Sequence, residues 1–311
     1  MRLLFFGYHN VGYFCLQVLI ELCREWGDEI AAVVTHADNP HENLWFASVR
    51  DLAFQHYLPV YQPEDVNDPA FVAVMAKLKP DLLFSCYYRH MLKPPLLALP
   101  SRGALNLHGS LLPKYRGRVP VNWVLVHGET ETGVTLHYMV AKADQGDMVA
   151  QRRVPIAPED TAETLFAKMT VAAAELLRET YPRLRAGTAP RIPQDHSQAT
   201  YDPPCDEKVA AIDWSKPGRA VFNFIRGCDP QPGATALFRG EKVKFYNPRF
   251  VELEHEAPPG EILEVNPDLG LTVAVAGGAV RITPFRTKAL GKVKAPEFIE
   301  ALKPKAGERF E

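Results

Sequence analysis

The sequence has little excess of charge of either sign. Among its 311 residues, 35 are Lys or Arg and 37 are Asp or Glu, for a formal net charge of −2. A protein that attracts nucleic acid or an anionic membrane electrostatically needs a basic surface, and this composition does not supply one. We therefore expect small-molecule ligands, no nucleic acid partner and no insertion into a membrane.

Long hydrophobic runs and paired cysteines are also absent. No window of about 20 residues is apolar enough to span a bilayer, and the apolar run after Met1 stops at Gly7, too short for a signal peptide. The five cysteines are odd in number, widely spaced and without a CxxC pair, which argues against a structural zinc site, so no metal is expected. These absences predict a cytoplasmic protein with reduced thiols.

The first 190 residues alternate between short apolar runs and helical patterns. Helical patterns lie near residues 12–25, 46–56 and 69–79, and a long helix is expected from Asp160 to Gly187, capped by Asp160 and Glu163. This alternation predicts an α/β fold with a Rossmann-like, doubly wound and mostly parallel sheet. The expected strands are Leu3–Phe6, Ile30–Thr35, Leu82–Cys86, Ala104–Leu107, Thr132–Val140 and Met148–Ile156.

A polar, proline-rich stretch over residues 191–209 has the composition of a linker. Beyond it, short apolar segments separated by Gly, Pro and Asn predict a small, OB-like β-barrel. The expected organisation is a catalytic domain over residues 1–190, the linker, and a β-barrel domain over residues 210–311.

The turn after the first strand lacks the middle glycine of a dinucleotide-binding GxGxxG motif. Gly7 and Gly12 are present, but Tyr8, His9 and Asn10 fill the turn between them. This departure disfavours a nicotinamide dehydrogenase. The two glycines either only shape the turn or place Tyr8, His9 and Asn10 along a substrate pocket at the carboxyl ends of the strands.

Asn106 and His108 lie two apart at the end of a predicted strand, so their side chains share one face. A histidine there can transfer protons near neutral pH, and an asparagine amide can donate to a developing oxyanion. A carboxylate is needed to orient the histidine and raise its pKa, and Asp144 is the candidate. Spacing alone leaves open whether Asp144 reaches His108.

Two neighbouring features carry competing interpretations. Ser110 lies outside any GxSxG elbow, so a structural role in the loop is favoured over a nucleophilic one, and Cys86 has the pattern of a small buried side chain. Lys114, Arg116 and Arg118 alternate on a loop near the strand ends. They form either a solvated face or a site for a phosphate or carboxylate ligand.

The stretches NLHGSLLPKYRGRVP and GETETGVTLHYMVAKADQGDMVAQ resemble the signature of the folate-dependent formyltransferases. The likeness is close over the first 190 residues and looser through IDWSKP and IRGCDPQPGA. Within the family, FGYHNVG, THADNPHE and FSCYYRHML are most similar to enzymes that formylate UDP-4-amino-4-deoxy-L-arabinose. The resemblance implies transfer of a formyl group from 10-formyltetrahydrofolate to the amine of a nucleotide-linked sugar, in lipid A modification and polymyxin resistance.

The resemblance also implies roles for particular residues. The family's catalytic Asn, His and Asp fall on Asn106, His108 and Asp144. The implied folate contacts are His90, Met91, Leu92, Arg118, Val140, Ala141, Lys142, Ala143 and Asp144. Tyr8, His9, Asn10, Lys114 and Arg116 are candidates for the sugar-nucleotide side of the site.

Three alternatives remain at this point. A methionyl-tRNA formyltransferase needs a basic surface, yet residues 206–311 hold 16 Lys or Arg against 15 Asp or Glu, and the loop THADNPHENLW has no Lys or Arg. A formyltetrahydrofolate hydrolase could use the same triad. A non-catalytic folate or nucleotide-sugar binding protein is disfavoured by the intact Asn106, His108 and Asp144.

Overall fold

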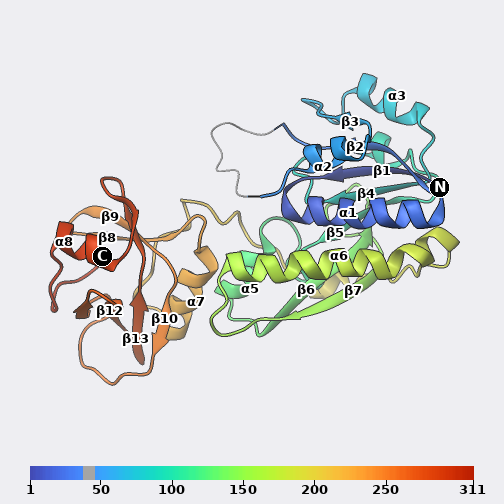
Figure 1. Cartoon of the computed structure of the whole chain (residues 1–311). Helices are drawn as coiled ribbons and strands as arrows, with labels where there is room; N and C mark the ends of the chain where they lie inside the picture. The colour runs from blue at the N-terminus through green and yellow to red at the C-terminus, as the bar shows by residue number, and fades with distance from the viewer. Residues whose placement is uncertain (38–45) are drawn as a thin grey trace. The chain divides into compact units, whose positions relative to one another are not determined.

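The computed structural model describes residues 1–37 and 46–311 (Figure 1). They divide into two compact units, which we describe separately. The first comprises Met1–Gly117, Glu131–Pro155 and Ala167–Asp202, and the second comprises Arg118–Thr130, Ile156–Phe166 and Pro203–Glu311. Most of the stretch with linker composition, residues 191–202, therefore packs as part of the first unit.

The first unit is built on a seven-stranded sheet of order β3-β2-β1-β4-β5-β6-β7. Strands β1 to β5 pair in parallel, and β6 and β7 join antiparallel at one edge. The prediction of an α/β domain with a mostly parallel sheet is confirmed. The strands are β1 (Arg2–Gly7), β2 (Glu29–Val34), β3 (Val60–Tyr61), β4 (Leu82–Cys86), β5 (Ala104–His108), β6 (Glu131–Tyr138) and β7 (Met148–Pro155).

Helices cover both faces of this sheet (Figure 1). On one face, Leu4 packs with Met75 and Leu96 of two short helices, and on the other, the ring of Phe84 lies 6.4 Å from that of Tyr181 in the longest helix. Burial on both faces explains why the strands are continuous apolar runs. The helices are α1 (His9–Trp26), α2 (Val49–Gln55), α3 (Pro69–Lys77), α4 (Pro94–Leu97), α6 (Ala162–Ala186) and the 3₁₀ turn η1 (His196–Gln198).

The start of α6 corrects one prediction. The reciprocal capping pair is Thr161 and Thr164, not Asp160 and Glu163: the N–H of Thr161 donates to Thr164 Oγ1, and the N–H of Thr164 donates to Thr161 Oγ1. Asp160 instead accepts from the Thr164 hydroxyl and from the N–H of Ala157. The capping spacing of three residues is right but lies one residue later, because Asp160 stabilises the preceding turn.

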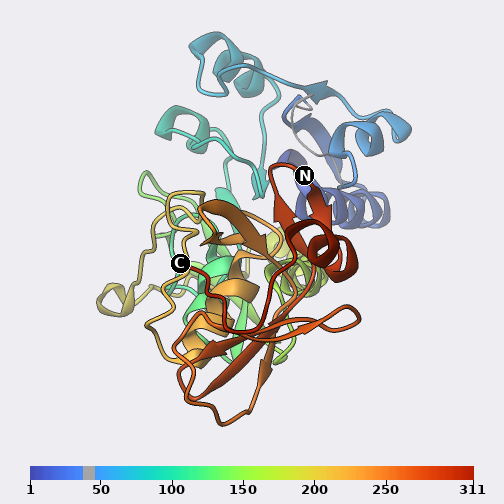
Figure 2. The ribbon, with the colours of Figure 1, turned by 90° about the vertical axis from the view of Figure 1, so that its left-hand side faces the viewer.

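The second unit contains two four-stranded antiparallel sheets, of order β10-β13-β12-β11 and β15-β14-β9-β8 (orange to red in Figure 2). Its core is aromatic and includes Trp214, Phe245, Phe285, Phe298 and Phe310. The prediction of a C-terminal β domain is confirmed. Its elements are α5 (Pro120–Val126), α7 (Gly218–Cys228), β8 (Ala234–Phe238), β9 (Glu241–Phe245), β10 (Arg249–Val251), β11 (Ile262–Asn266), β12 (Gly270–Val275), β13 (Gly278–Ile282), β14 (Phe285–Thr287), β15 (Gly291–Val293) and α8 (Ala295–Leu302).

Two inferences from the sequence depend on which residues the structure describes. Within 1–37 and 46–311, no helix combines the length and apolarity needed to cross a membrane. The loop without Lys or Arg that argues against a tRNA substrate lies largely in residues 38–45, outside the described part of the chain.

The buried carboxylate of Asp28, at the amino end of the sheet, leads to a prediction about stability. The Asp28 side chain is fully buried; its carboxylate pairs with the Met1 amino group and accepts from Tyr181 Oη at 2.7 Å and Arg185 Nε at 3.0 Å. Burial raises the pKa of Asp28, but these three donors outweigh it and lower the pKa below 3.8. Asp28→Asn should lower the free energy of unfolding by about 2–3 kcal/mol, measured by urea denaturation.

The matched control is Glu29→Gln, since Glu29 is an exposed neighbour paired with Arg2. Its expected effect lies within about 0.5 kcal/mol. Because the folded pKa of Asp28 is depressed, its contribution is present above the unfolded pKa of 3.8 and is lost as the pH falls through the lower folded value. Equal stability of the two variants at pH 7 would contradict the assignment.

Candidate active site

The carboxyl end of β5 carries two of the predicted site residues. Asn106 and His108 lie two apart in β5, between β4 and β6, so their side chains point to the same face of the sheet. Antiparallel pairing with β6 sets Asn106 opposite His137 and His108 opposite Thr135. The turn from β6 to β7 contains Asp144. Strand register therefore gathers groups that are far apart in the sequence.

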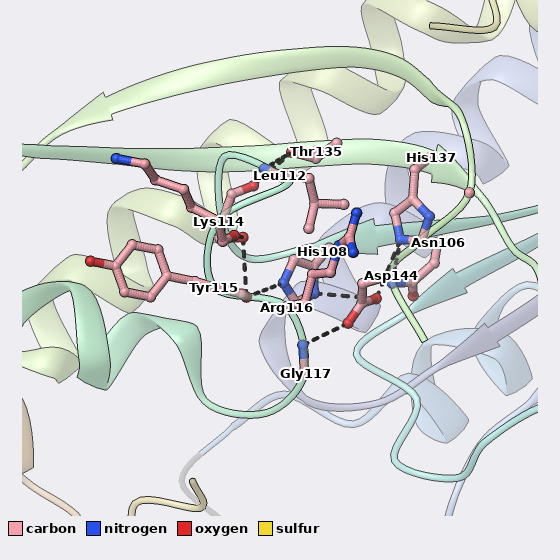
Figure 3. A network of polar contacts seen from close by, with 12 residues as sticks. Asn106, His108, Leu112, Lys114, Tyr115, Arg116, Gly117, Thr135, His137 and Asp144 are labelled. Carbon is pink, nitrogen blue, oxygen red and sulfur yellow. Dashed lines mark hydrogen bonds and ion pairs between the residues drawn. The ribbon is translucent and has the colours of Figure 1, made fainter. Parts of the chain in front are cut away.

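Two histidine side chains meet at the Asp144 carboxylate, and Asn106 joins them through one of the histidines (Figure 3). Oδ1 of Asp144 lies 3.5 Å from His108 Nδ1 and 3.4 Å from His137 Nε2. Oδ2 accepts a 2.9 Å hydrogen bond from the backbone N–H of Gly117. His137 Nε2 also lies 3.3 Å from Asn106 Nδ2. The structure thus brings Asn106, His108 and Asp144 into one cluster, which residue spacing left open.

Both ring nitrogens of His108 face oxygen acceptors. Nδ1 faces Asp144, and Nε2 lies 2.8 Å from the backbone carbonyl oxygen of Tyr115. A neutral imidazole has one N–H and can donate to only one of these oxygens, whereas an imidazolium can donate to both. The surroundings of His108 are therefore arranged to stabilise the ring after it gains a proton.

The pKa of His108 corrects the sequence-based expectation. Burial is the largest influence and lowers it; the Asp144 charge and the Tyr115 carbonyl raise it, but the result stays below 6.5. Burial also raises the pKa of Asp144, but the charge of His108, the nearby His137 ring and the hydrogen bond from the N–H of Gly117 outweigh it and bring that pKa to about 2. At neutral pH, a neutral His108 therefore lies beside an ionised Asp144. The charge of Asp144 does raise the pKa of His108, as expected, but burial lowers that pKa by more.

His137 belongs to this cluster, although sequence reasoning did not single it out. It is buried, and its Nδ1 lies 2.9 Å from the carbonyl oxygen of Tyr138, so Nδ1 carries the hydrogen. In the neutral ring, Nε2 then accepts from the Asn106 amide, which fixes that amide's orientation. The sequence does place His137 in the strand that follows β5. Only the pairing register of β5 and β6 shows that His137 lies opposite Asn106.

The structure supports the structural interpretations of Ser110 and Cys86. The Ser110 hydroxyl is buried and donates to the carbonyl of Lys114 at 2.7 Å. The hydroxyl of Thr135 in turn donates to the Ser110 carbonyl at 2.6 Å. Cys86 is fully buried at the end of β4. Ser110 therefore shapes the loop after β5, and Cys86 packs in the core.

Comparison with known proteins gives a family assignment. Residues 1–181 match the family described as formyl transferase, and residues 206–303 match the formyl transferase C-terminal domain. The chain belongs to the formyl transferase family. The prediction of a formyltransferase enzyme is confirmed, and both parts of the chain contribute to that match.

Solved structures with the same fold include sugar-modifying relatives of this formyltransferase. An N-formyltransferase from Helicobacter canadensis, in complex with folinic acid and dTDP-3-aminofucose, has a TM-score of 0.69 at 19% identity, covering 94% of this chain and 100% of that one. WlaRD, a sugar 3N-formyl transferase with dTDP and 5-N-formyl-THF, has a TM-score of 0.68 at 17% identity, covering 94% and 98%.

HypX from Aquifex aeolicus, in complex with tetrahydrofolic acid, also shares the fold. It has a TM-score of 0.68 at 21% identity over 99% of this chain. This formyltransferase spans about half the length of HypX, since the match covers 48% of that chain. At these identities, the structural likeness establishes the fold.

The three cations of the KYRGR stretch differ in their surroundings. Lys114 and Arg118 are exposed, as a ligand-binding loop requires. Arg116 is 3% exposed, and its guanidinium donates to Gln194 and Tyr201. The structure therefore leaves Lys114 and Arg118 accessible to an anion and places Arg116 inside the protein.

Apart from Arg118, the residues implied to contact folate lie on the loops after β4 and β6. Met91 and Val140 present apolar side chains to solvent, with 54% and 46% exposure. His90 and the run Ala141–Ala143 are exposed as well. The Leu92 side chain is buried in the core, so only its backbone can meet a ligand. Two exposed apolar side chains suit the packing of a flat, largely apolar ring.

Tyr8, His9 and Asn10 form the turn from β1 into α1. Tyr8 and His9 are buried, and the His9 ring lies 4.2 Å from that of Phe46. Asn10 Oδ1 accepts from the N–H of Ala47 at 2.9 Å. A Cβ on Gly12 would lie 2.9 Å from the Gly7 carbonyl carbon, so the glycine permits a close approach of helix and turn. These contacts favour the turn-shaping interpretation of the two glycines.

Proposed function

We propose that this enzyme transfers a formyl group from 10-formyltetrahydrofolate to the amine of a nucleotide-linked amino sugar. The observation that carries the proposal is the cluster of Asn106, His108 and Asp144 at the carboxyl end of β5, in a chain of the formyl transferase family. The folate supplies the activated formyl group. The protein's task is to orient the amine, move its proton and stabilise negative charge on the formyl oxygen.

Each role follows from the surroundings of the side chain. The Tyr115 carbonyl can only accept, so Nε2 of neutral His108 carries the hydrogen, and the unprotonated Nδ1 accepts a proton from the attacking amine. The resulting imidazolium donates to both Asp144 and the Tyr115 carbonyl, so the charge forms where acceptors already face it. His137 holds one hydrogen of the Asn106 amide, which leaves the other to donate to the formyl oxygen. The imidazolium then returns the proton to the folate nitrogen as the bond from that nitrogen to the formyl carbon breaks, so this direct transfer needs no nucleophilic Ser or Cys.

The acceptor is the finer part of the proposal. The chain resembles the formyltransferase half of the bifunctional polymyxin-resistance protein ArnA, so UDP-4-amino-4-deoxy-L-arabinose is our first candidate. The structural relatives from H. canadensis and WlaRD carry dTDP ligands, which makes a dTDP-amino sugar the principal alternative. A diphosphate in either nucleotide suits the exposed Lys114 and Arg118.

The deciding experiment measures tetrahydrofolate release from 10-formyltetrahydrofolate. Separate reactions contain UDP-4-amino-4-deoxy-L-arabinose, dTDP- and GDP-amino sugars, methionyl-tRNA, or no acceptor. Release that depends on one amino sugar supports the proposal and identifies the acceptor. Equal release without an acceptor would instead establish a hydrolase. Release only with methionyl-tRNA would replace the sugar by a nucleic acid substrate.

Arg118→Ala tests the exposed cation beside the cluster. Arg118 follows Gly117, whose N–H binds Asp144, so its side chain starts close to the reacting groups. We expect the KM of one of the two substrates to rise about tenfold, as for one lost charge-assisted hydrogen bond of about 1.5 kcal/mol. The control is Arg153→Ala, an exposed arginine on β7 paired with Glu131. Unchanged KM values for both substrates would make Arg118 a solvated surface residue.

A further inference from the structure

Residues 192–201, which have the composition of a linker, cross the two loops that hold the catalytic cluster. At one end, Met148 and Ile192 exchange backbone hydrogen bonds of 2.8 and 2.9 Å. At the other, the N–H of Arg116 donates to the Thr200 carbonyl at 3.0 Å, and the N–H of Tyr115 donates to the Thr200 hydroxyl at 2.8 Å. The segment is therefore attached to both the loop after β5 and the first residue of β7.

The buried guanidinium of Arg116 is directed at this segment. Its Nε and Nη2 donate to Oε1 of Gln194 at 3.2 and 2.7 Å. Nη2 also donates to Nδ1 of His196 at 2.9 Å, and Nη1 donates to Oη of Tyr201 at 3.1 Å. A charged side chain that is 3% exposed and bonded through all three nitrogens has a fixed geometry. Arg116 is thus a rigid support for Gln194.

Gln194 uses the rest of its amide on the loop that carries Asp144. It is 6% exposed, and its Nε2 donates to the backbone carbonyls of Asp144 at 2.8 Å and Gly146 at 2.7 Å. Both hydrogens of the amide nitrogen and the amide oxygen are therefore committed. No rotamer of a shorter or purely accepting side chain reproduces this set of contacts.

These contacts close a ring around Asp144. Its carboxylate accepts from the N–H of Gly117, the residue after Arg116, while its carbonyl accepts from Gln194, which Arg116 holds. Asp144 also has a left-handed backbone, with φ of 56°. That conformation is unfavourable for a residue other than glycine, by about 1 kcal/mol or more. It persists when hydrogen bonds fix the residue from both sides.

We propose that Gln194, held by Arg116, is the positioning residue that sets the Asp144 carboxylate against His108. This inference rests on the proposed catalytic role of Asp144. It makes residues 192–201 part of the active-site structure. It also gives Arg116 a purpose other than binding the phosphate of a substrate.

The test replaces Gln194 by glutamate. A glutamate still accepts from Arg116, but its carboxylate cannot donate to the carbonyls of Asp144 and Gly146 and repels them. We expect kcat to fall at least tenfold, since small displacements of a catalytic group cost about that much or more, while both KM values stay within threefold. Gln198→Glu, the same change at an exposed position of the same segment, is the control.

Two readouts separate positioning from a general structural role. In Gln194→Asn, which adds no charge near the site, the acid limb of the kcat/KM profile should move to lower pH, because displacement of Asp144 weakens the negative charge that raises the pKa of His108. Hydrogen exchange at the Gly117 amide should become at least about tenfold faster, because that N–H is bonded to Asp144. Gln194→Asn, which keeps the amide but is one methylene shorter, serves if Gln194→Glu does not fold.

The outcomes are distinguishable from failure of the proposed function. Unchanged Gly117 exchange together with kcat within twofold of the wild type in either Gln194 variant would overturn the inference. If Asp144→Asn itself retains full activity, the proposed function fails first. The exchange measurement would still report whether Gln194 holds the loop, because it does not require turnover.

Discussion

Replacing His108 by alanine is expected to lower kcat by about 10²- to 10⁴-fold, the range for a positioned general base. The buried imidazole is the group that accepts the amine proton, and Asp144 and the Tyr115 carbonyl can stabilise its charge but cannot replace it. Folate affinity should stay within a few-fold, because the exposed residues implied to bind folate, apart from Arg118, lie on other loops. The measurement pairs steady-state turnover with equilibrium binding of a folate analogue.

The control for this variant is His56→Ala. His56 is an exposed histidine at the end of α2, in the same unit. It should leave both kcat and folate binding unchanged. Turnover of His108→Ala near the wild-type value would remove His108 from the mechanism. A parallel loss of folate binding would instead indicate that the alanine collapses the loop that packs on the ring.

The sheet of the first unit was predictable because its strands are buried on both faces. Each of β1, β2, β4 and β5 is a short run of apolar residues, and the predicted bounds agree with the observed ones to within a residue or two. The shared face of Asn106 and His108 followed from strand alternation alone. The helix-capping pattern was less reliable, because Asp160 and Thr161 are neighbouring residues that both have the chemistry of a cap at the start of α6.

The rest of the site depends on contacts between distant parts of the chain. His137 became visible only when the register of β5 and β6 set it opposite Asn106. In the sequence, Arg116 looks like one of three cations on a loop. In the structure it is buried and donates hydrogen bonds to residues 78 and 85 positions further along the chain. Gln194 lies in a stretch whose composition is that of a linker. Composition describes how a segment behaves alone, and here the segment is bonded to two loops.

The charge state of His108 likewise could not be obtained from residue types. A histidine beside an aspartate suggests a raised pKa, and that contribution is present. The opposing contribution is the loss of solvent around the ring, which depends on how loop and strand pack. Since burial is the larger influence, His108 is neutral at pH 7 and able to accept a proton, which the proposed reaction requires.

Asp144→Asn is expected to lower kcat by about 10²- to 10⁴-fold, as when the carboxylate that orients a catalytic histidine becomes an amide. The variant removes the charge that stabilises protonated His108 and one acceptor for its ring. With a pKa of about 2, the native carboxyl is ionised throughout the useful pH range, so the loss should be seen at every pH assayed. Circular dichroism and urea denaturation check that the variant is folded.

The direction of the pH shift distinguishes this role from a structural one. In the native enzyme, burial depresses the pKa of His108 and Asp144 partly offsets that effect. Removing the negative charge leaves burial less opposed, so the pKa falls further and the unprotonated ring persists to lower pH. The acid limb of kcat/KM should therefore move to lower pH in Asp144→Asn, although the maximum is much reduced. A limb that stays in place would mean that Asp144 and His108 do not interact during turnover, and a limb that moves to higher pH would mean that another acidic group controls the histidine.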